Sequence, residues 1–154
     1  MAAFYFDTSG LVKRYAAEVG TAWVIGVTDP RAGNYLHTVR LTGPEMVAAL
    51  FRKVRTGAAT QIDIERAAAN FASDWQGQYE IVDVIAAIAD RAMQLARRYP
   101  LRGYDAVHLA AALETNDTYQ RRSGSHVTLI SADQDQLQAA ASEGMLIDDP
   151  NGHP

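Results

Sequence analysis

The stretch Ala3-Phe-Tyr-Phe-Asp-Thr-Ser9 decides the fold of this chain. Its first four residues, 3–6, form a short apolar and aromatic run that is typical of a buried β-strand. Asp7, Thr8 and Ser9 follow at once, and all three residue types are favoured at the N-terminal cap of a helix. The sequence therefore opens with a strand that leads directly into a helix.

The same alternation continues along the rest of the chain. We expect strands at residues 3–6, 34–38, 79–83, 127–130 and 145–147, and helices at 8–20, 21–27, 41–54, 60–75, 85–98, 104–113 and 133–142. The polar residues 115–126 predict one long loop, and residues 149–154 predict a flexible tail. Because strands alternate with helices throughout, we predict an α/β fold with a mostly parallel sheet, as a single domain over residues 1–148.

Composition excludes several classes of protein. The chain has 154 residues, of which 48% are hydrophobic and 21% are charged, as in ordinary globular domains. There is no cysteine, so disulfides, thiolate zinc sites and a cysteine nucleophile are excluded. No apolar run is long enough to cross a membrane, and Asp7 interrupts the apolar N-terminal start, so we expect no membrane association and a cytoplasmic location.

Four carboxylates lie where a catalytic site could form. Asp7 and Asp133 follow two predicted strands, Asp105 begins the predicted helix 104–113, and Glu45 lies one turn into the predicted helix 41–54. Taken singly, each is also explained as a helix cap, a first-turn charge or a solvated side chain. Together at the carboxyl edge of a sheet, they would repel one another unless a cation neutralised them. Mg²⁺ and Mn²⁺ prefer such oxygen ligands, and this pattern favours phosphodiester chemistry.

Four segments then resemble the acidic motifs of one family. They are residues 4–14 (FYFDTSGLVKR), 41–49 (LTGPEMVAA), 104–112 (YDAVHLAAA) and 129–137 (LISADQDQL). In order and spacing they resemble PIN-domain proteins, and in particular the VapC toxins of type II toxin–antitoxin systems. The resemblance covers nearly the whole chain.

This resemblance implies a three-layer α/β/α fold and an endoribonuclease that depends on Mg²⁺ or Mn²⁺. Carried over by position, it implies that Asp7, Glu45, Asp105 and Asp133 are the catalytic metal ligands. It also implies an RNA substrate, a cognate antitoxin that covers the active-site groove, and a homodimer.

Neighbouring residues suggest supporting roles. Ser9 and Ser131 match polar positions beside the first and fourth acids and could orient ligands, and Asp135 is a rival or helper for Asp133. Among the basic residues, Lys13, Arg14 and Arg52 are candidate contacts to the RNA backbone. His108, three residues after Asp105, is interpreted as a packed histidine of an apolar helix.

Net charge adds a constraint on the nucleic-acid hypothesis. The 14 basic and 18 acidic residues give a formal charge of −4, and the charge is balanced once the four site acids are set aside. Without a broad basic stripe, non-specific RNA affinity should be modest and sensitive to salt. Two alternatives stay open at this point: a metal-dependent DNA nuclease or phosphatase that uses the same acids, and a non-catalytic interaction module.

Overall fold

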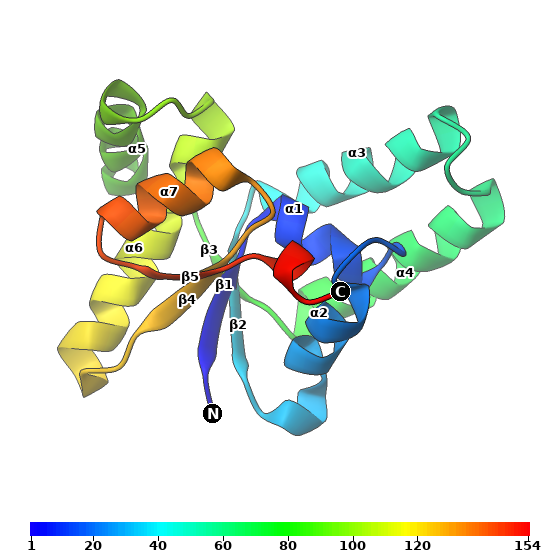
Figure 1. Cartoon of the computed structure of the whole chain (residues 1–154), viewed down its shortest axis with the longest axis horizontal. Helices are drawn as coiled ribbons and strands as arrows, with labels where there is room; N and C mark the ends of the chain where they lie inside the picture. Colours follow the sequence, from blue (N-terminus) through cyan, green and yellow to red (C-terminus); the bar gives the residue numbers. More distant parts are fainter.

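The computed structural model describes residues 1–154 as five strands in one sheet with helices on both faces (Figure 1). The strands are β1 (Ala3–Phe6), β2 (Tyr35–Val39), β3 (Glu80–Val82), β4 (Val127–Ile130) and β5 (Leu146–Asp148). The helices are α1 (Thr8–Leu11), α2 (Thr21–Thr28), α3 (Thr42–Arg55), α4 (Gln61–Gly77), α5 (Ala86–Arg98), α6 (Gly103–Ser123) and α7 (Gln134–Ser142), with 3-10 turns at Val12–Arg14, Pro30–Ala32 and Pro150–Gly152.

The sheet has the strand order β3-β2-β1-β4-β5, and every neighbouring pair is parallel. The predicted parallel sheet is therefore confirmed, and each predicted strand is present at its place in the chain. The order reverses at β1, which lies between β2 and β4. In sheets of this kind, ligands bind beyond the carboxyl ends of the strands at such a reversal.

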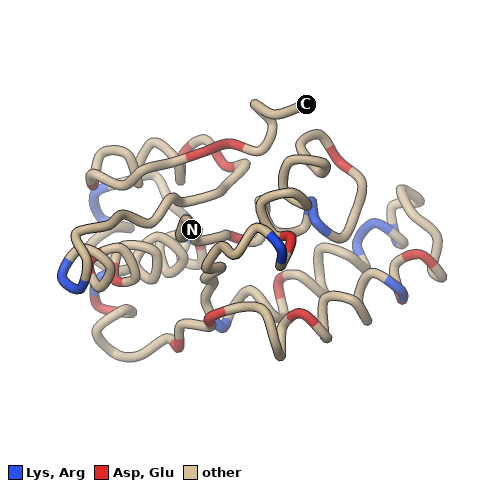
Figure 2. The backbone as a smooth tube through the Cα atoms, turned by 90° about the horizontal axis from the view of Figure 1, so that it is seen from below, with Lys and Arg blue, Asp and Glu red and all other residues tan.

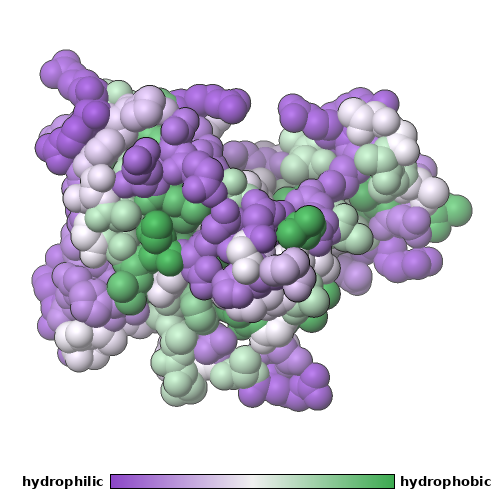
Figure 3. Space-filling model, viewed as in Figure 1, coloured by the Kyte–Doolittle hydropathy of each residue, from purple (hydrophilic) through white to green (hydrophobic).

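Two hydrophobic cores sandwich the sheet. Along β1 the side chains alternate, so that Tyr5 belongs to the core under α5, α6 and α7, while Phe6 belongs to the core under α1, α2, α3 and α4. This confirms the three-layer α/β/α arrangement. The paired helices α3 and α4 extend away from the sheet as a hairpin (Figure 1). In the same view, the surface is hollowed between this hairpin and the lobe that carries α5 to α7 (Figure 3).

Helix α6 corrects the prediction of a loop over residues 115–126. It continues through those polar residues to Ser123 and ends at Gly124, whose φ of 69° is the left-handed conformation that glycine adopts readily. Two of the polar side chains are buried in it: Thr115 donates to the backbone oxygen of Ala111, and Asn116 accepts from the backbone N–H of Val127 at 2.9 Å. Because both buried polar groups are hydrogen-bonded, neither pays the free-energy cost of an unsatisfied polar atom in the helix.

Residues 8–20 do not form the single helix that their apolar spacing predicts. Helix α1 ends at Leu11, a 3-10 turn follows to Arg14, and the chain then continues without a helix to Gly20. Gly20 has φ of 85° and packs so closely on the backbone of Pro150 that a side chain would collide with it.

The C-terminal residues 149–154 were expected to be a flexible tail, whereas they make specific contacts. Pro150 is buried, and the ring of His153 stacks on that of Trp23 in α2 with 4.2 Å between centroids. Asn151 accepts a hydrogen bond from Lys13. The end of the chain therefore packs against α2 and the turn that precedes it. Elsewhere in the fold, none of the helices has the length and apolar character that a membrane crossing requires.

Candidate active site

Asp7 lies at the centre of the carboxyl edge, directly after β1. Its backbone N–H donates to the oxygen of Ile130, so β1 and β4 end side by side, and its side chain caps α1 by accepting from the N–H of Gly10 at 2.9 Å. Ser9 and Ser131 also donate to its carboxylate, at 2.8 and 2.9 Å. The residue is only 4% exposed, and burial raises the pKa of Asp7 in spite of these hydrogen bonds.

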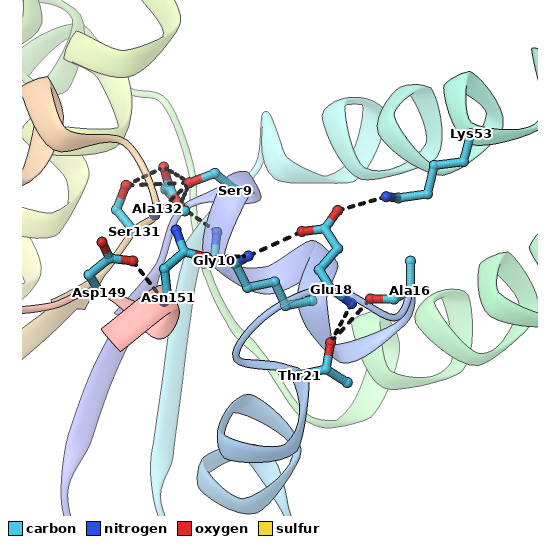
Figure 4. A network of polar contacts seen from close by, with 12 residues as sticks. Ser9, Gly10, Ala16, Glu18, Thr21, Lys53, Ser131, Ala132, Asp149 and Asn151 are labelled. Atoms are coloured by element: carbon cyan, nitrogen blue, oxygen red, sulfur yellow. Dashed lines mark hydrogen bonds and ion pairs between the residues drawn. The ribbon is translucent and has the colours of Figure 1, made fainter. Parts of the chain in front are cut away.

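Ser131 and Asp133 come from the adjoining end of β4. The Ser131 hydroxyl is fully buried and accepts the backbone N–H of Asp133 at 3.0 Å. Asp133 caps α7, because its Oδ1 accepts from the backbone N–H groups of Asp135 and Gln136. A further contact links Ser9 to this segment, since its hydroxyl accepts the N–H of Ala132 at 2.9 Å (Figure 4). The two predicted serines therefore do contact the acidic residues that they were expected to orient. Asp135 is exposed to solvent.

Asp105 lies in the first turn of α6. Burial raises the pKa of Asp105, and the negative charges of Asp133 and Glu45 raise it further. Gln136 of α7 donates to the backbone oxygen of Asp105 at 3.1 Å and so connects the starts of the two helices. The charges of two carboxylates from other segments therefore act on Asp105 at this edge.

Glu45 lies in the first turn of α3, directly after Gly43 and Pro44, which belong to the same turn. Its Oε1 is 2.7 Å from Nε2 of His108, and Nδ1 of His108 is 3.4 Å from the hydroxyl of Tyr5. His108 is packed, as the sequence predicts, with 2% exposure. The sequence gives no sign of its pairing with Glu45 except that it lies three residues after Asp105, on the same side of α6.

The basic residues predicted to contact RNA divide into two kinds. Lys13 is 4% exposed and binds Glu18 and Asn151, and Arg14 binds Tyr79, Gln78 and Asp74. Glu18, the acidic partner of Lys13, also pairs with Lys53 of α3 (Figure 4). Lys13 and Arg14 are therefore turned into the protein and held by these contacts instead of pointing into solvent.

Arg52, by contrast, is exposed and lines the same cleft as Glu45, between α3 and the segment that contains Thr8. Figure 2 shows acidic and basic positions interspersed along the backbone, with no continuous basic stripe.

Comparison with known proteins agrees with this geometry. Residues 5–142 match the model of the PIN domain. The chain belongs to the PIN-domain family. The ribonuclease VapC45 of Mycobacterium tuberculosis is 33% identical to it over 117 residues, which cover 76% of this chain and 79% of that protein. Two solved structures share the fold. PAE2754 from Pyrobaculum aerophilum is 17% identical with a TM-score of 0.63, and the match covers 98% of this chain and 85% of that one. A toxin–antitoxin complex from Klebsiella pneumoniae is 16% identical with a TM-score of 0.64, and the match covers 96% of this chain and 98% of that one.

The donor set of this PIN domain can be tested against the divalent cation that the family implies. All the donors are carboxylate oxygens, which Mg²⁺ and Mn²⁺ prefer. Burial raises the pKa of Asp7 and of Asp105, so their ionised forms are poorly solvated and a bound cation would stabilise them. No three of its histidine and carboxylate side chains are gathered around one point as ligands of a single ion. The residues therefore fit an ion held by one or two carboxylates together with water and substrate phosphate, which is the usual mode for Mg²⁺.

Proposed function

We propose that this PIN-domain protein is a Mg²⁺- or Mn²⁺-dependent endoribonuclease and the toxin of a toxin–antitoxin pair. The observation that carries the proposal is the environment of Asp7. Its carboxylate is buried, is held by three hydrogen-bond donors and has no lysine or arginine within ion-pair distance. Because a buried charge without a counter-charge is costly, a divalent cation at this position would complete the site. The similarity to a ribonuclease VapC supports RNA as the substrate.

Each site residue has a role in this proposal. Asp7, Asp105, Asp133 and Glu45 are the candidate ligands, of which one or two would bind the cation directly while the others would hold its water molecules. The bound cation would polarise the phosphodiester and make a water molecule more acidic. Asp133 already uses Oδ1 to cap α7, so its other oxygen is the one free for the ion.

The supporting residues act through these carboxylates or on the substrate. Ser9 and Ser131 hold Asp7 in place, and exposed Asp135 is a helper of Asp133. Arg52 contacts a substrate phosphate from the cleft that it shares with Glu45.

Cleavage of labelled RNA by the purified chain tests the activity. We expect cleavage with Mg²⁺ or Mn²⁺, no cleavage in EDTA, and loss of cleavage in Asp7→Asn and in Asp105→Asn. Asp90→Asn is the matched control, because Asp90 is an exposed carboxylate of α5 without an ion pair. Full activity of both site variants would contradict the assignment.

The same assay separates the alternative activities. Single-stranded DNA, flap DNA and a phosphomonoester are offered beside RNA under the same conditions. Faster turnover of DNA or of the monoester would favour a DNA nuclease or a phosphatase. A chain that neither binds Mn²⁺ nor cleaves any of them would be an interaction module.

The partners in this proposal are an antitoxin and a second copy of the chain. The shared fold with a toxin–antitoxin complex supports the first. An apolar cleft beside the site, between α5 and the start of α6, offers a surface for an antitoxin segment; it includes Met93, Tyr104 and Val107. Co-purification with the product of the neighbouring gene tests this partner, and light scattering tests the homodimer. A monomer that binds no such product would contradict both. A cytoplasmic location belongs to the same proposal, because a ribonuclease would meet its RNA substrate there.

A further inference from the structure

Three side chains from three separate elements form a series of hydrogen bonds that ends at the site. Tyr5 of β1 is fully buried, His108 of α6 is 2% exposed, and the side chain of Glu45 at the start of α3 is 30% exposed. The Glu45 contact to His108 measures 2.7 Å and the His108 contact to Tyr5 measures 3.4 Å. This series of hydrogen bonds therefore runs from the core to the open edge of the sheet.

The chemistry of each group determines which atom donates and which accepts in this series of hydrogen bonds. An ionised Glu45 carboxylate can only accept, so Nε2 of His108 must carry the hydrogen in the contact at Oε1. In a neutral ring, Nδ1 is then an acceptor, and the hydroxyl of Tyr5 is its donor. With a neutral ring, both contacts are satisfied when Tyr5 donates to His108 and His108 donates to Glu45.

Burial limits what His108 can do. With 2% exposure it cannot reach a substrate, so any effect on the reaction must pass through the residue that it contacts. Its neighbours on α6 include Leu109, Ala110 and Ala111, and an apolar side chain would pack among them without needing a hydrogen-bond partner. Packing alone does not require a polar ring at this position, but the ring donates a hydrogen bond to the carboxylate of Glu45.

We propose that His108, backed by Tyr5, is a positioning residue that fixes the Glu45 carboxylate by occupying Oε1 and leaving Oε2 free for the cation. This inference rests on the proposed metal-dependent function. Glutamate has a flexible side chain, and a carboxylate that is oriented in advance loses less conformational entropy when it binds an ion. Hydrogen bonds of this kind behind a metal ligand typically change metal affinity by about 10–100-fold.

Calorimetric titration of the metal-free chain with Mn²⁺ alone measures this effect without any assay of cleavage. We expect His108→Leu to weaken Mn²⁺ binding by about 10–100-fold. His108→Gln should recover part of the loss, because its amide N–H can donate to Glu45. The matched control is His37→Leu, since His37 is also a buried histidine with a hydrogen bond, to Tyr119, and lies on β2 outside the site. That control should leave Mn²⁺ affinity unchanged.

A double-mutant cycle identifies the path of the effect. In a Glu45→Gln background, His108→Leu should cause little further loss, because the carboxylate that it orients has gone. An equal loss in both backgrounds, or an unchanged affinity in His108→Leu alone, would overturn the inference. If the wild-type chain binds no Mn²⁺, the inference fails as well. If it binds Mn²⁺ with the expected dependence on His108 but leaves RNA uncut, the proposed ribonuclease fails and the positioning role stands.

A second measurement covers the case in which His108→Leu does not fold. Long-range proton–nitrogen NMR of the wild-type chain reports which ring nitrogen carries the hydrogen. We expect a hydrogen on Nε2 of His108, and a shift of its Nδ1 resonance in Tyr5→Phe, which removes only the phenol hydroxyl. A ring protonated at Nδ1 alone would overturn the inference.

Discussion

The hydroxyl of Ser131 lies 2.9 Å from Oδ2 of Asp7, although the two residues are 124 positions apart in the chain. The same hydroxyl oxygen accepts the backbone N–H of Asp133 at 3.0 Å. One buried oxygen thus connects the residues that follow β1 and β4, two neighbouring strands of the sheet. The parallel pairing brings these ends together, and Ser131 fixes the distance between them.

Ser131→Ala should therefore destabilise the chain as well as its site. The substitution leaves the buried Asp7 carboxylate and the N–H of Asp133 each without one partner, which costs about 1–3 kcal/mol. Urea denaturation in EDTA measures this loss. Ser142→Ala is the control, because its exposed hydroxyl contacts only the backbone of its own helix, and it should change stability by less than about 0.5 kcal/mol. Equal stability of the two variants would contradict the role of Ser131.

Asp7→Asn should stabilise the metal-free chain while it abolishes cleavage. Burial raises the folded-state pKa of Asp7 above its ordinary value of 3.8, so the folded chain holds this proton more tightly than the unfolded chain does. The stability that this gives is present at low pH and is lost as the pH rises through the folded pKa. At neutral pH the ionised carboxylate is therefore a net cost, which neutral asparagine avoids. Thermal unfolding in EDTA compares the stability of the metal-free variant with that of the wild type.

The outcome should be a higher melting temperature for Asp7→Asn than for wild type. Cleavage should fall by more than the roughly 10–100-fold that loss of an outer contact causes. Asp90→Asn, at an exposed position, should change neither quantity. A lower melting temperature in Asp7→Asn would show that the ionised form stabilises the fold.

The sequence predicts the sheet and the order of its acidic residues because those features depend on local patterns. The apolar run of residues 3–6 is short, and helix-capping residues follow it directly. Adjacent residues alone therefore predict both the strand and the position of Asp7 at its end. The contact between Asp7 and Ser131 depends on how β1 and β4 pair, and a pairing of strands so far apart leaves only a weak sign in the sequence.

What could not be predicted depends on partners distant in the sequence. Lys13 is turned inward because Glu18 and Asn151 lie beside it, and no local pattern places Asn151 there. The polar residues after Thr115 resemble a loop, yet α6 continues because Asn116 meets the start of β4. In both cases a tertiary contact outweighs the local preference.

Asn116→Ala tests this explanation of the long helix. The substitution leaves the buried N–H of Val127 without its side-chain acceptor, and we expect a loss of about 1–3 kcal/mol of unfolding free energy. The control is Asn70→Ala on α4, an exposed asparagine for which about 0.5 kcal/mol or less is expected. Urea denaturation measures both. If Asn116→Ala is as stable as the control, the buried contact does not hold α6 to β4.

Arg52→Ala should weaken RNA binding and reduce its dependence on salt. An exposed cation that contacts one phosphate of a single strand contributes about 0.7 to the slope of log affinity against log salt. Fluorescence anisotropy with labelled RNA, in an Asp7→Asn background that prevents cleavage, measures affinity and slope together. Arg121→Ala is the control: it removes an exposed arginine sixteen residues beyond Asp105 on α6, about 24 Å along the helix. Equal slopes in the two variants would remove Arg52 from the proposed RNA contacts.

His37 should make the chain less stable in mild acid. Burial lowers its folded-state pKa below the ordinary value of 6.5, while its hydrogen bond to Tyr119 keeps the ring in the core. As the pH falls through 6.5, the unfolded chain takes up a proton on His37 before the folded chain does, so stability is lost in that window. His37→Gln removes this titration and keeps a polar side chain next to Tyr119. Between about pH 7.5 and about pH 5.5, its melting temperature should therefore fall less than that of wild type. His126→Gln, at an exposed histidine, should follow the wild-type profile, and a His37→Gln profile parallel to wild type would show that acid acts elsewhere.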